Sequence, residues 1–330
     1  MSDPAGGDAL DRTESRSDRR VAVVDCGSNS TRLLLASVAD SQVRDARRHT
    51  VITRLGRDVD RTGQLSASAI DRVTSVIDDY AAQWRAEGID DVAVCATSAV
   101  RDAANATRFL RAVERATGVT PVVLSGVEEA ELTFAGGVAG MPGRHVVCDI
   151  GGGSTELIVG QGTPEHRVSL QLGSVRLRER HLHNDPPTVE EYAALIADVD
   201  AVLAGQPGVY AAEDDTPLIA VAGTATTLAA VAARVGPDMA GQIDNMLLTT
   251  AELAQVIERL AWLPARRRLL HPAIVPGRED VVVAGGLLLA RVLDRFGFKA
   301  VRVRVADLLD GVAVRLAADD WPQAGSRVSA

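Results

Sequence analysis

The sequence predicts an α/β fold with mixed sheets, arranged as two related domains. The first observation behind this prediction is an internal repeat, because residues 25–35 (DCGSNSTRLLL) match residues 149–159 (DIGGGSTELIV) at five positions. The second is the alternation of short apolar runs with amphipathic helical segments, which is typical of α/β proteins. The length of 330 residues leaves room for two domains of ordinary size.

Each copy of the repeat lies between apolar runs, which indicates a strand, a Gly-rich turn and a second strand. Small residues let the backbone approach a ligand closely, and successive N–H groups can bind an anion. A single copy favours an ordinary tight turn, but two matching copies favour phosphate binding. The glycines lead into a strand, which excludes a dinucleotide-binding fingerprint. The predicted phosphate-binding residues are Gly27, Ser28, Asn29, Ser30, Thr31, Arg32, Gly151, Gly152, Gly153 and Ser154.

Between the two copies, the pattern predicts strands that alternate with helices. Apolar residues recur at helical spacing over residues 70–84, and Gly88 ends this helix, so its aromatic residues belong to the core. Ser125 and Glu128 have the spacing of a capping box and begin a further helix. The predicted strands in this part are 51–55, 92–96 and 121–124, and the helices are 68–88, about 105–117 and the one that begins at 125.

The second half of the chain repeats this order. Its predicted strands are 167–172, 218–222 and 301–305, and its helices are 189–203, 251–263, 281–296 and an Ala-rich helix after 223. The Gly-rich stretch 136–143 indicates a domain boundary. The predicted organisation is a disordered tail (1–20), domain I (21–135), domain II (136–306), a C-terminal helix that packs on domain I (307–320) and a second tail (321–330).

Composition excludes several classes of protein. The net charge of −9 argues against general nucleic-acid binding. The sequence contains no apolar run of about 18 residues, so we expect no membrane-spanning helix. The first 20 residues lack the apolar centre of a signal peptide, and we expect a cytoplasmic protein. The three cysteines form no CxxC pair and lie in apolar runs, which favours buried thiols. Lys299 is the only lysine, which excludes a Walker A loop.

Charged residues flank the two Gly-rich turns. Asp25 precedes the first turn, and Asp149 and Glu156 bracket the second. Carboxylates are not expected on apolar strands beside a phosphate site unless they bind a cation, and Mg²⁺ takes one or two carboxylates together with phosphate oxygens and waters. Arg32 and Arg101 follow a turn and a strand, where each suits a bidentate contact with phosphate.

Other positions keep two interpretations. Gly223 and Thr224 follow a buried strand and begin a helix, where free N–H groups and the helix dipole favour an anion. An ordinary threonine cap explains them equally well. Glu129 lies in the first turn of the helix that begins at 125, and the residues alone favour a solvated position for it. The run 266–268 (RRR) favours a solvated loop.

Taken in order, the motifs resemble those of the exopolyphosphatase/guanosine pentaphosphate phosphohydrolase (Ppx/GppA) family. The resemblance covers about residues 21–316. The matching segments are 25–32 (DCGSNSTR), 55–56 with 62–63 (LG and TG), 96–101 (ATSAVR), 125–130 (SGVEEA), 149–156 (DIGGGSTE), 172–176 (LGSVR) and 223–227 (GTATT). The resemblance implies two ribonuclease-H-like domains of the actin, sugar kinase and Hsp70 superfamily around a central cleft.

The resemblance also implies roles for residues. Glu129 becomes the catalytic base, and Arg101 contacts the phosphate. Asp149 and Glu156 bind Mg²⁺ and organise the attacking water, with Asp25 as a further ligand. Mn²⁺ is an alternative metal and a monovalent cation an additional one. The expected assembly is a homodimer.

The expected reaction is release of terminal orthophosphate from inorganic polyphosphate. Longer relatives carry a C-terminal helical domain of the HD type after this core, which the sequence lacks after Trp321, so we expect short chains to be favoured. Guanosine pentaphosphate is the alternative substrate, although the few aromatic residues favour polyphosphate. A polyphosphate- or alarmone-binding regulator with little turnover is the alternative from another class. The segment 125–129 argues against a sugar kinase or an actin-like ATPase.

Overall fold

The computed structural model describes residues 18–236 and 239–322. It confirms the predicted α/β fold with mixed sheets, one of five strands and one of six. Residues 1–17 and 323–330 of the predicted tails lie outside the described part. Arg19, which we placed in the first tail, instead begins a strand, and Trp321 of the second tail is buried.

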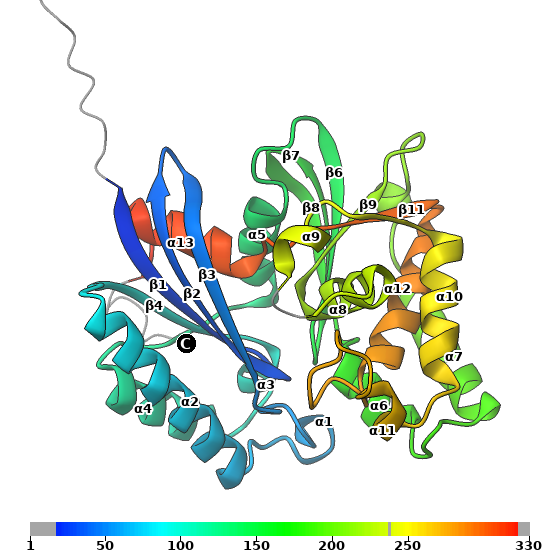
Figure 1. The fold of residues 1–330 in the computed structure, drawn as a ribbon, viewed down its shortest axis with the longest axis horizontal. Coiled ribbons are helices and arrows are strands. Elements are labelled where there is room, and N and C mark those ends of the chain that lie inside the picture. The colour runs from blue at the N-terminus through cyan, green and yellow to red at the C-terminus, as the bar shows by residue number, and fades with distance from the viewer. Residues whose placement is uncertain (1–17, 237–238, 323–330) are drawn as a thin grey trace, which may run out of the picture.

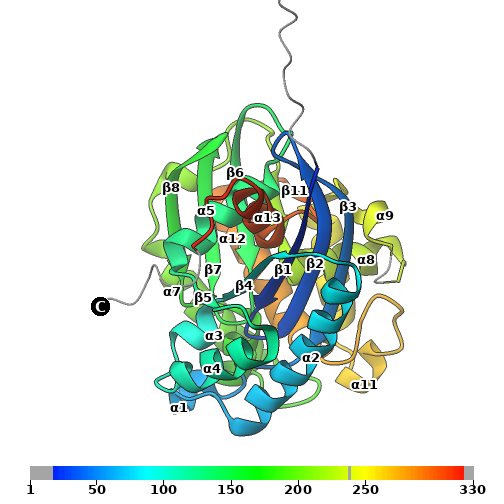
Figure 2. The same ribbon diagram turned by 90° about the vertical axis from the view of Figure 1, so that its left-hand side faces the viewer.

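Sheet A has the order β3-β2-β1-β4-β5, with β1 antiparallel to β2 and parallel to β4. Both faces are covered, by α2 and α4 on one side and by α13 on the other (Figures 1 and 2). A strand buried on both faces needs a continuous apolar run, which explains residues 21–24 (VAVV). The elements are β1 (Arg19–Cys26), β2 (Ser30–Ala39), β3 (Gln42–Ile52), β4 (Asp91–Ala96), β5 (Val122–Val123), α1 (Val59–Thr62), α2 (Ala67–Ala86), α3 (Ser98–Arg101), α4 (Ala106–Thr117) and α13 (Leu308–Ala317).

Sheet B has the order β10-β11-β9-β6-β7-β8 and is covered by α5 on one face and mainly by α8, α10 and α12 on the other (Figure 1). Its β6-β7 hairpin repeats the antiparallel β1-β2 hairpin of sheet A. The elements are α5 (Gly126–Gly137), β6 (Arg144–Ile150), β7 (Thr155–Gln161), β8 (Thr163–Leu170), α6 (Ser174–His181), α7 (Val189–Ala204), η1 (Gly208–Tyr210), β9 (Leu218–Val221), α8 (Ala222–Ala233), α9 (Ala240–Ile243), β10 (Leu247–Thr249), α10 (Thr250–Ala261), α11 (Ala265–Arg268), α12 (Val282–Phe296) and β11 (Ala300–Val303).

The third strand of sheet A differs from the prediction. We expected a strand at 51–55, but β3 runs from Gln42 to Ile52 and the chain then turns away. Thr53 and Arg54 donate their backbone N–H groups to the carbonyl of Asn29, at 3.0 and 2.9 Å, which fixes this turn against the first Gly-rich loop. The sequence did not predict the early part of β3, because this is an exposed edge strand. Its sequence (QVRDARRHT) lacks the apolar pattern of a buried strand.

Helices α5 and α13 lie side by side between the two sheets (Figures 1 and 2). Their crossing is close because glycines meet backbone there: a Cβ atom on Gly136 would clash with the carbonyl of Asp307, and one on Gly311 with that of Leu132. The predicted boundary after residue 135 therefore lies inside α5, which packs on sheet B, while α13 packs on sheet A. The first turn of α5 faces the cleft between the sheets.

Candidate active site

The two Gly-rich loops have the same backbone geometry. Gly27 donates its N–H to the carbonyl of Ser30, and Gly151 donates to the carbonyl of Ser154, both at 3.0 Å. Each loop is therefore a hairpin connection of two residues between antiparallel strands. The repeat that the sequence contains is thus a structural repeat, one copy in each sheet.

The two loops meet across the cleft. A Cβ atom on Gly152 would lie 2.9 Å from Cβ of Ser28 and 3.1 Å from the backbone nitrogen of Asn29. A Cβ atom on Gly153 would lie 2.5 Å from Oγ of Ser98. Glycine is needed at both positions because the backbone of one loop rests directly on the other.

A cavity of about 70 Å³ lies at this meeting point. It brings together all the predicted site residues except Thr31, Arg101 and Glu156. The predicted residues that line it are Asp25, Gly27, Ser28, Asn29, Ser30, Arg32, Glu129, Asp149, Gly151, Gly152, Gly153, Ser154, Gly223 and Thr224. Backbone amides and small side chains form most of this wall, which is the chemistry that suits a phosphoryl group.

The three remaining residues lie behind the wall. Thr31 is fully buried and its hydroxyl is 3.0 Å from that of Thr53. Glu156 accepts a hydrogen bond from Ser169 at 2.7 Å. Arg101 contacts Glu129 rather than the cavity itself. Thr31 therefore supports the loop from the core, and the other two act on the cavity through their charges.

Glu129 is buried at the start of α5. The predicted capping box forms, since the Ser125 side chain accepts from the N–H of Glu128 and the Glu128 carboxylate accepts from that of Ser125. Glu128 thus faces the helix end, and Glu129, about 100° further round the helix, faces the cleft with 7% of its surface exposed. The interpretation of Glu129 as a solvated residue, which its local sequence favoured, is wrong.

Burial raises the pKa of Glu129 to about 8, and the neighbouring carboxylates of Asp149 and Asp25 raise it as well. The charge and hydrogen bond of Arg101 act in the opposite direction. Arg101 Nη1 lies 3.0 Å from Oε2 of Glu129 and 2.8 Å from the carbonyl of Leu124. A carboxylate whose pKa lies near neutrality is suited to accept a proton.

Four carboxylates gather around the cavity, and two of them form ion pairs, Asp25 with Arg32 and Glu129 with Arg101. Burial raises the pKa of Asp149 to about 7, and it raises the pKa values of Asp25 and Glu156 as well. Asp149 and Glu156 are direct cross-strand partners of β6 and β7, where two like charges repel. Oδ1 of Asp25 is buried and has no hydrogen-bond partner in the described part of the chain. The described residues nevertheless hold no group of three or more His, Cys, Asp or Glu arranged around one metal position.

A model of the Ppx/GppA phosphatase family matches residues 34–319 of this chain. The chain belongs to this family. Over 316 residues it is 37% identical to exopolyphosphatase 2 of Mycobacterium tuberculosis, which covers 90% of this chain and 98% of that protein. Over 303 residues it is 33% identical to exopolyphosphatase 1 of Mycobacterium bovis, with 90% and 88% covered.

Solved structures agree with this assignment. The crystal structure of an exopolyphosphatase-like protein superposes with a TM-score of 0.83 at 32% identity and covers 91% of this chain and 98% of that one. The Ppx/GppA family member of Aquifex aeolicus superposes with a TM-score of 0.75 at 28% identity, with 92% and 99% covered. This chain is therefore a phosphatase with the fold of its family. In the part of it that the structure describes, no helix is both long and apolar enough to cross a membrane.

Two site residues of this Ppx/GppA phosphatase have no counterpart among the predicted ones. Arg278, in the loop before α12, lines the cavity, and its guanidinium rests on the Cα atom of Gly223. Within the described residues that guanidinium has neither a hydrogen bond nor an ion pair, and burial together with the charge of Arg32 lowers its pKa to about 10. Asp307, the cap of α13, forms an ion pair with Arg32. No local motif marks Arg278, which follows a Pro-Gly turn like many solvated arginines.

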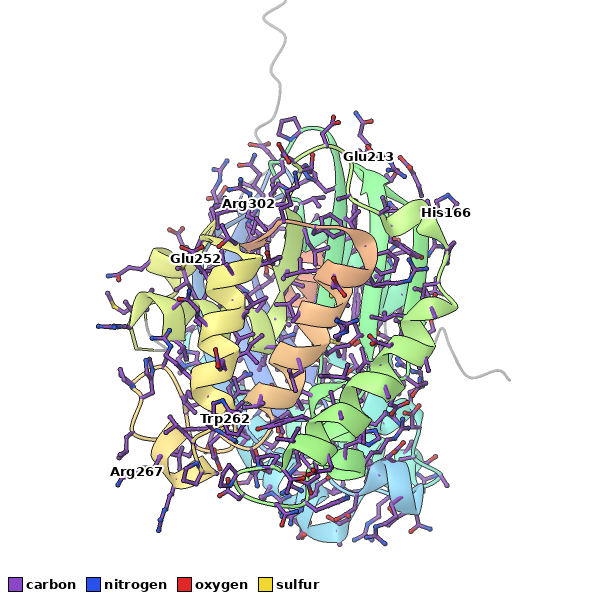
Figure 3. The ribbon with its side chains drawn as sticks, turned by 90° about the vertical axis from the view of Figure 1, so that its right-hand side faces the viewer. His166, Glu213, Glu252, Trp262, Arg267 and Arg302 are labelled. Carbon is purple, nitrogen blue, oxygen red and sulfur yellow. The ribbon has the colours of Figure 1, made fainter. Side chains whose placement is uncertain are left out.

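The run of arginines at 266–268 also differs from the prediction. It forms the short helix α11, where Arg266 and Arg267 are exposed and Arg267 points into solvent (Figure 3). Arg268 is buried and donates to the carbonyls of Leu260 and Glu279, at 2.8 and 2.7 Å. Its role is to hold the loop that carries Arg278.

A second cavity, of about 760 Å³, adjoins the first. Arg32, Gly223 and Arg278 line both cavities. The edge strand β3 forms one wall of the larger cavity, and α8, α9 and the loop before α13 form the other. The two arginines therefore stand where a molecule bound in the larger cavity would enter the smaller one.

Proposed function

We propose that this phosphatase is an exopolyphosphatase that removes the terminal orthophosphate of inorganic polyphosphate by in-line attack of water, with Mg²⁺ and with a preference for short chains. One observation carries the proposal. A buried glutamate whose pKa lies near neutrality, Glu129, opens onto a small cavity walled by the amides of two matching hairpin loops. The names of relatives that match over nine tenths of the chain point the same way.

The chemistry divides between the loops and the helix. Backbone N–H groups of residues 28–30 and 152–154 would hold the phosphoryl oxygens, since positioning and electrostatics dominate phosphoryl transfer. Glu129 would accept the proton of the attacking water. Arg101 keeps the carboxylate of Glu129 in one orientation and, through its charge, keeps part of it ionised at neutral pH. The N-terminus of α8 at Gly223 would face the next phosphate.

The residues fit a divalent cation. Oδ1 of Asp25 has no hydrogen-bond partner among the described residues, and the raised pKa of Asp149 indicates a carboxylate that is poorly compensated. These two carboxylates would hold the ion, and waters and phosphate oxygens would complete its coordination shell. Glu156 lies behind the cavity wall and would influence the ion through its charge. When bound, Mg²⁺ supplies positive charge to the phosphoryl oxygens. Mn²⁺ would fit the same oxygen ligands, and an additional monovalent cation stays a prediction.

A preference for short chains stays a prediction. Asp244 and Asp307 line the larger cavity, through which a polyphosphate chain would leave the smaller one, but Arg32, Arg48 and Arg278 line it as well. The charge of this cavity therefore gives no argument for or against long chains.

Guanosine pentaphosphate hydrolysis is the second candidate, and the larger cavity is the observation that favours it. Val43, Ile243 and Val275 contribute apolar surface next to Arg32 and Arg278. Inorganic polyphosphate has no apolar part to bury there, whereas a nucleoside does.

The test is a phosphate-release assay with Mg²⁺ on tripolyphosphate, long-chain polyphosphate, guanosine pentaphosphate and ATP, with Glu129→Ala as the blank. The proposal expects release from tripolyphosphate with the highest kcat/KM. Faster release from guanosine pentaphosphate would establish the second candidate. Tight binding of any of them without release would instead support a regulator that senses polyphosphate or an alarmone. A homodimer in the cytoplasm stays a prediction.

A further inference from the structure

Arg32 is held between two carboxylates, which accept from three of its five N–H groups. Its Nε and Nη2 donate to Oδ2 of Asp25, at 3.0 and 2.8 Å. Its Nη1 pairs with Oδ2 of Asp307. Asp25 comes from the neighbouring strand of the same hairpin, whereas Asp307 comes from the cap of α13. The guanidinium lines both cavities, so the group that faces an incoming phosphate is already bound to protein.

Asp307 is held rigidly. Its Oδ1 accepts from the N–H of Leu309 at 3.0 Å, and its own N–H donates to Asp310 at 2.9 Å. Only 3% of its surface is exposed. The carboxylate therefore cannot follow Arg32 if that side chain turns toward a ligand, and the ion pair would have to break.

The capping role does not require a charge at this position. Serine and asparagine cap helices about as well as aspartate, because the cap needs only an acceptor for a backbone N–H. The negative charge of Asp307 is thus an additional feature. Together with Asp25 it gives the group around Arg32 a net charge of about −1, counted from one guanidinium and two carboxylates, beside a site for anions.

We propose that Asp307 lowers the affinity of the enzyme for its anionic substrate by neutralising Arg32 and by competing with a substrate phosphate for its Nη1. This inference rests on the proposed function, because it concerns the same cleft. Asp307 is here a specificity-determining residue that acts through Arg32. It lowers the affinity of the cleft for phosphate groups in general. Small anions, including the orthophosphate product, are therefore bound only weakly.

The experiment compares Asp307→Asn with Asp310→Asn. Asp310 is a similarly buried acid on the same helix that pairs with Arg48 and does not contact Arg32. It also accepts from the N–H of Asp307, and asparagine at this position keeps an oxygen for that bond. For each variant we would measure kcat and KM for tripolyphosphate. Calorimetry would give the Kd of tripolyphosphate and of inorganic phosphate in a Glu129→Gln background, which removes turnover. Asp307→Ser, which keeps a capping hydroxyl, serves as a second neutral variant in case the asparagine disturbs folding.

We expect Asp307→Asn and Asp307→Ser to lower KM and both Kd values by about 10-fold, with kcat changed less than about 2-fold. Asp310→Asn should change KM and both Kd values by less than about 3-fold. Equal effects of Asp307→Asn and Asp310→Asn would assign the change to overall charge and overturn the proposal, and so would a higher KM in both neutral variants. The Kd values can be measured without turnover. A wild-type enzyme that released no phosphate would therefore contradict the proposed function, and the Kd values would still test the role of Asp307.

Discussion

Arg101 and Glu129 form an ion pair inside the cleft, with 3.0 Å between Nη1 and Oε2. The arginine ends α3 beside sheet A, and the glutamate begins α5, which packs on sheet B. Nη2 of the same arginine is buried without a hydrogen-bond partner among the described residues. The pair thus joins the two halves of the molecule beside the cavity.

The first prediction concerns the base. Glu129→Gln keeps the shape of the side chain but cannot accept a proton, so kcat for tripolyphosphate should fall by at least about 100-fold while the Kd stays within about 3-fold. Glu131→Gln is the matched control, because Glu131 lies two residues further along and pairs with Arg167. Steady-state kinetics and calorimetry check both variants. Near-normal turnover of Glu129→Gln would remove Glu129 from the base role.

The second prediction concerns the pH profile. Arg101 lowers the pKa of Glu129, so Arg101→Ala should raise that pKa further above its ordinary range. A base must be ionised to act, so the rising limb of kcat/KM should move to higher pH, with the loss largest near neutrality. A profile from about pH 6 to pH 10 measures this shift. Arg101→Lys should move the limb less, and an unmoved limb in Arg101→Ala would contradict the assignment of the ion pair.

The sequence alone predicted the two hairpins and their loops, since the repeat preserves Gly27/Gly151 and Ser30/Ser154 between apolar runs. It failed for Glu129, because the burial of a residue on the first turn of a helix depends on which face the rest of the molecule covers. Only the resemblance to a family placed Glu129 in the site. In the structure, α5 lies between two sheets, and this arrangement has no signature in residues 125–137.

Arg278 and the role of Asp307 could not be predicted for a related reason. Arg278 lies more than 50 residues from Gly223 in sequence, yet its guanidinium rests on that glycine. Asp307 is distant from Arg32 in the same way. Pairs of this kind are created by the packing of loops from different elements, and a single sequence carries no periodicity that would reveal them.

The third prediction concerns metal and pH. The pKa values of Glu129 and Asp149 are raised to about 8 and about 7, so the folded state favours their protonated forms. Their contribution to stability is therefore fully present below about pH 4 and is lost as the pH rises through about 7 to 8. Without metal, Tm should fall from about pH 6 to about pH 9.

Mg²⁺ binds the ionised carboxylates, so it should raise Tm more at about pH 8.5 than at about pH 6. Scanning fluorimetry with and without Mg²⁺ measures the difference, with Ca²⁺ and Na⁺ as comparisons. Asp149→Asn should flatten the metal-free dependence on pH and reduce the effect of Mg²⁺. An equal rise in Tm at both pH values would argue against ligation by these groups.

The fourth prediction concerns the contact between the loops. Gly152→Ala would place a methyl group 2.9 Å from Cβ of Ser28 and 3.1 Å from the nitrogen of Asn29, so the loops must separate. We expect at least about a 10-fold loss of kcat/KM, because a small misplacement of oriented groups is costly. Gly208→Ala, with no atom within 4 Å of the new methyl group, is the control and should retain activity. Normal activity in Gly152→Ala would mean that the loops need not touch during catalysis.

The fifth prediction concerns Arg278, whose guanidinium has no partner among the described residues and lines both cavities. A free cation there should bind a substrate phosphate, so Arg278→Ala should raise KM by about 10-fold or more and change kcat less. Gly223→Ala should reproduce part of this effect, since its methyl group would push the guanidinium away without removing the charge. Arg266→Ala removes an exposed arginine and is the control for net charge. Equal KM values for Arg278→Ala and Arg266→Ala would show that Arg278 contributes only to the overall charge.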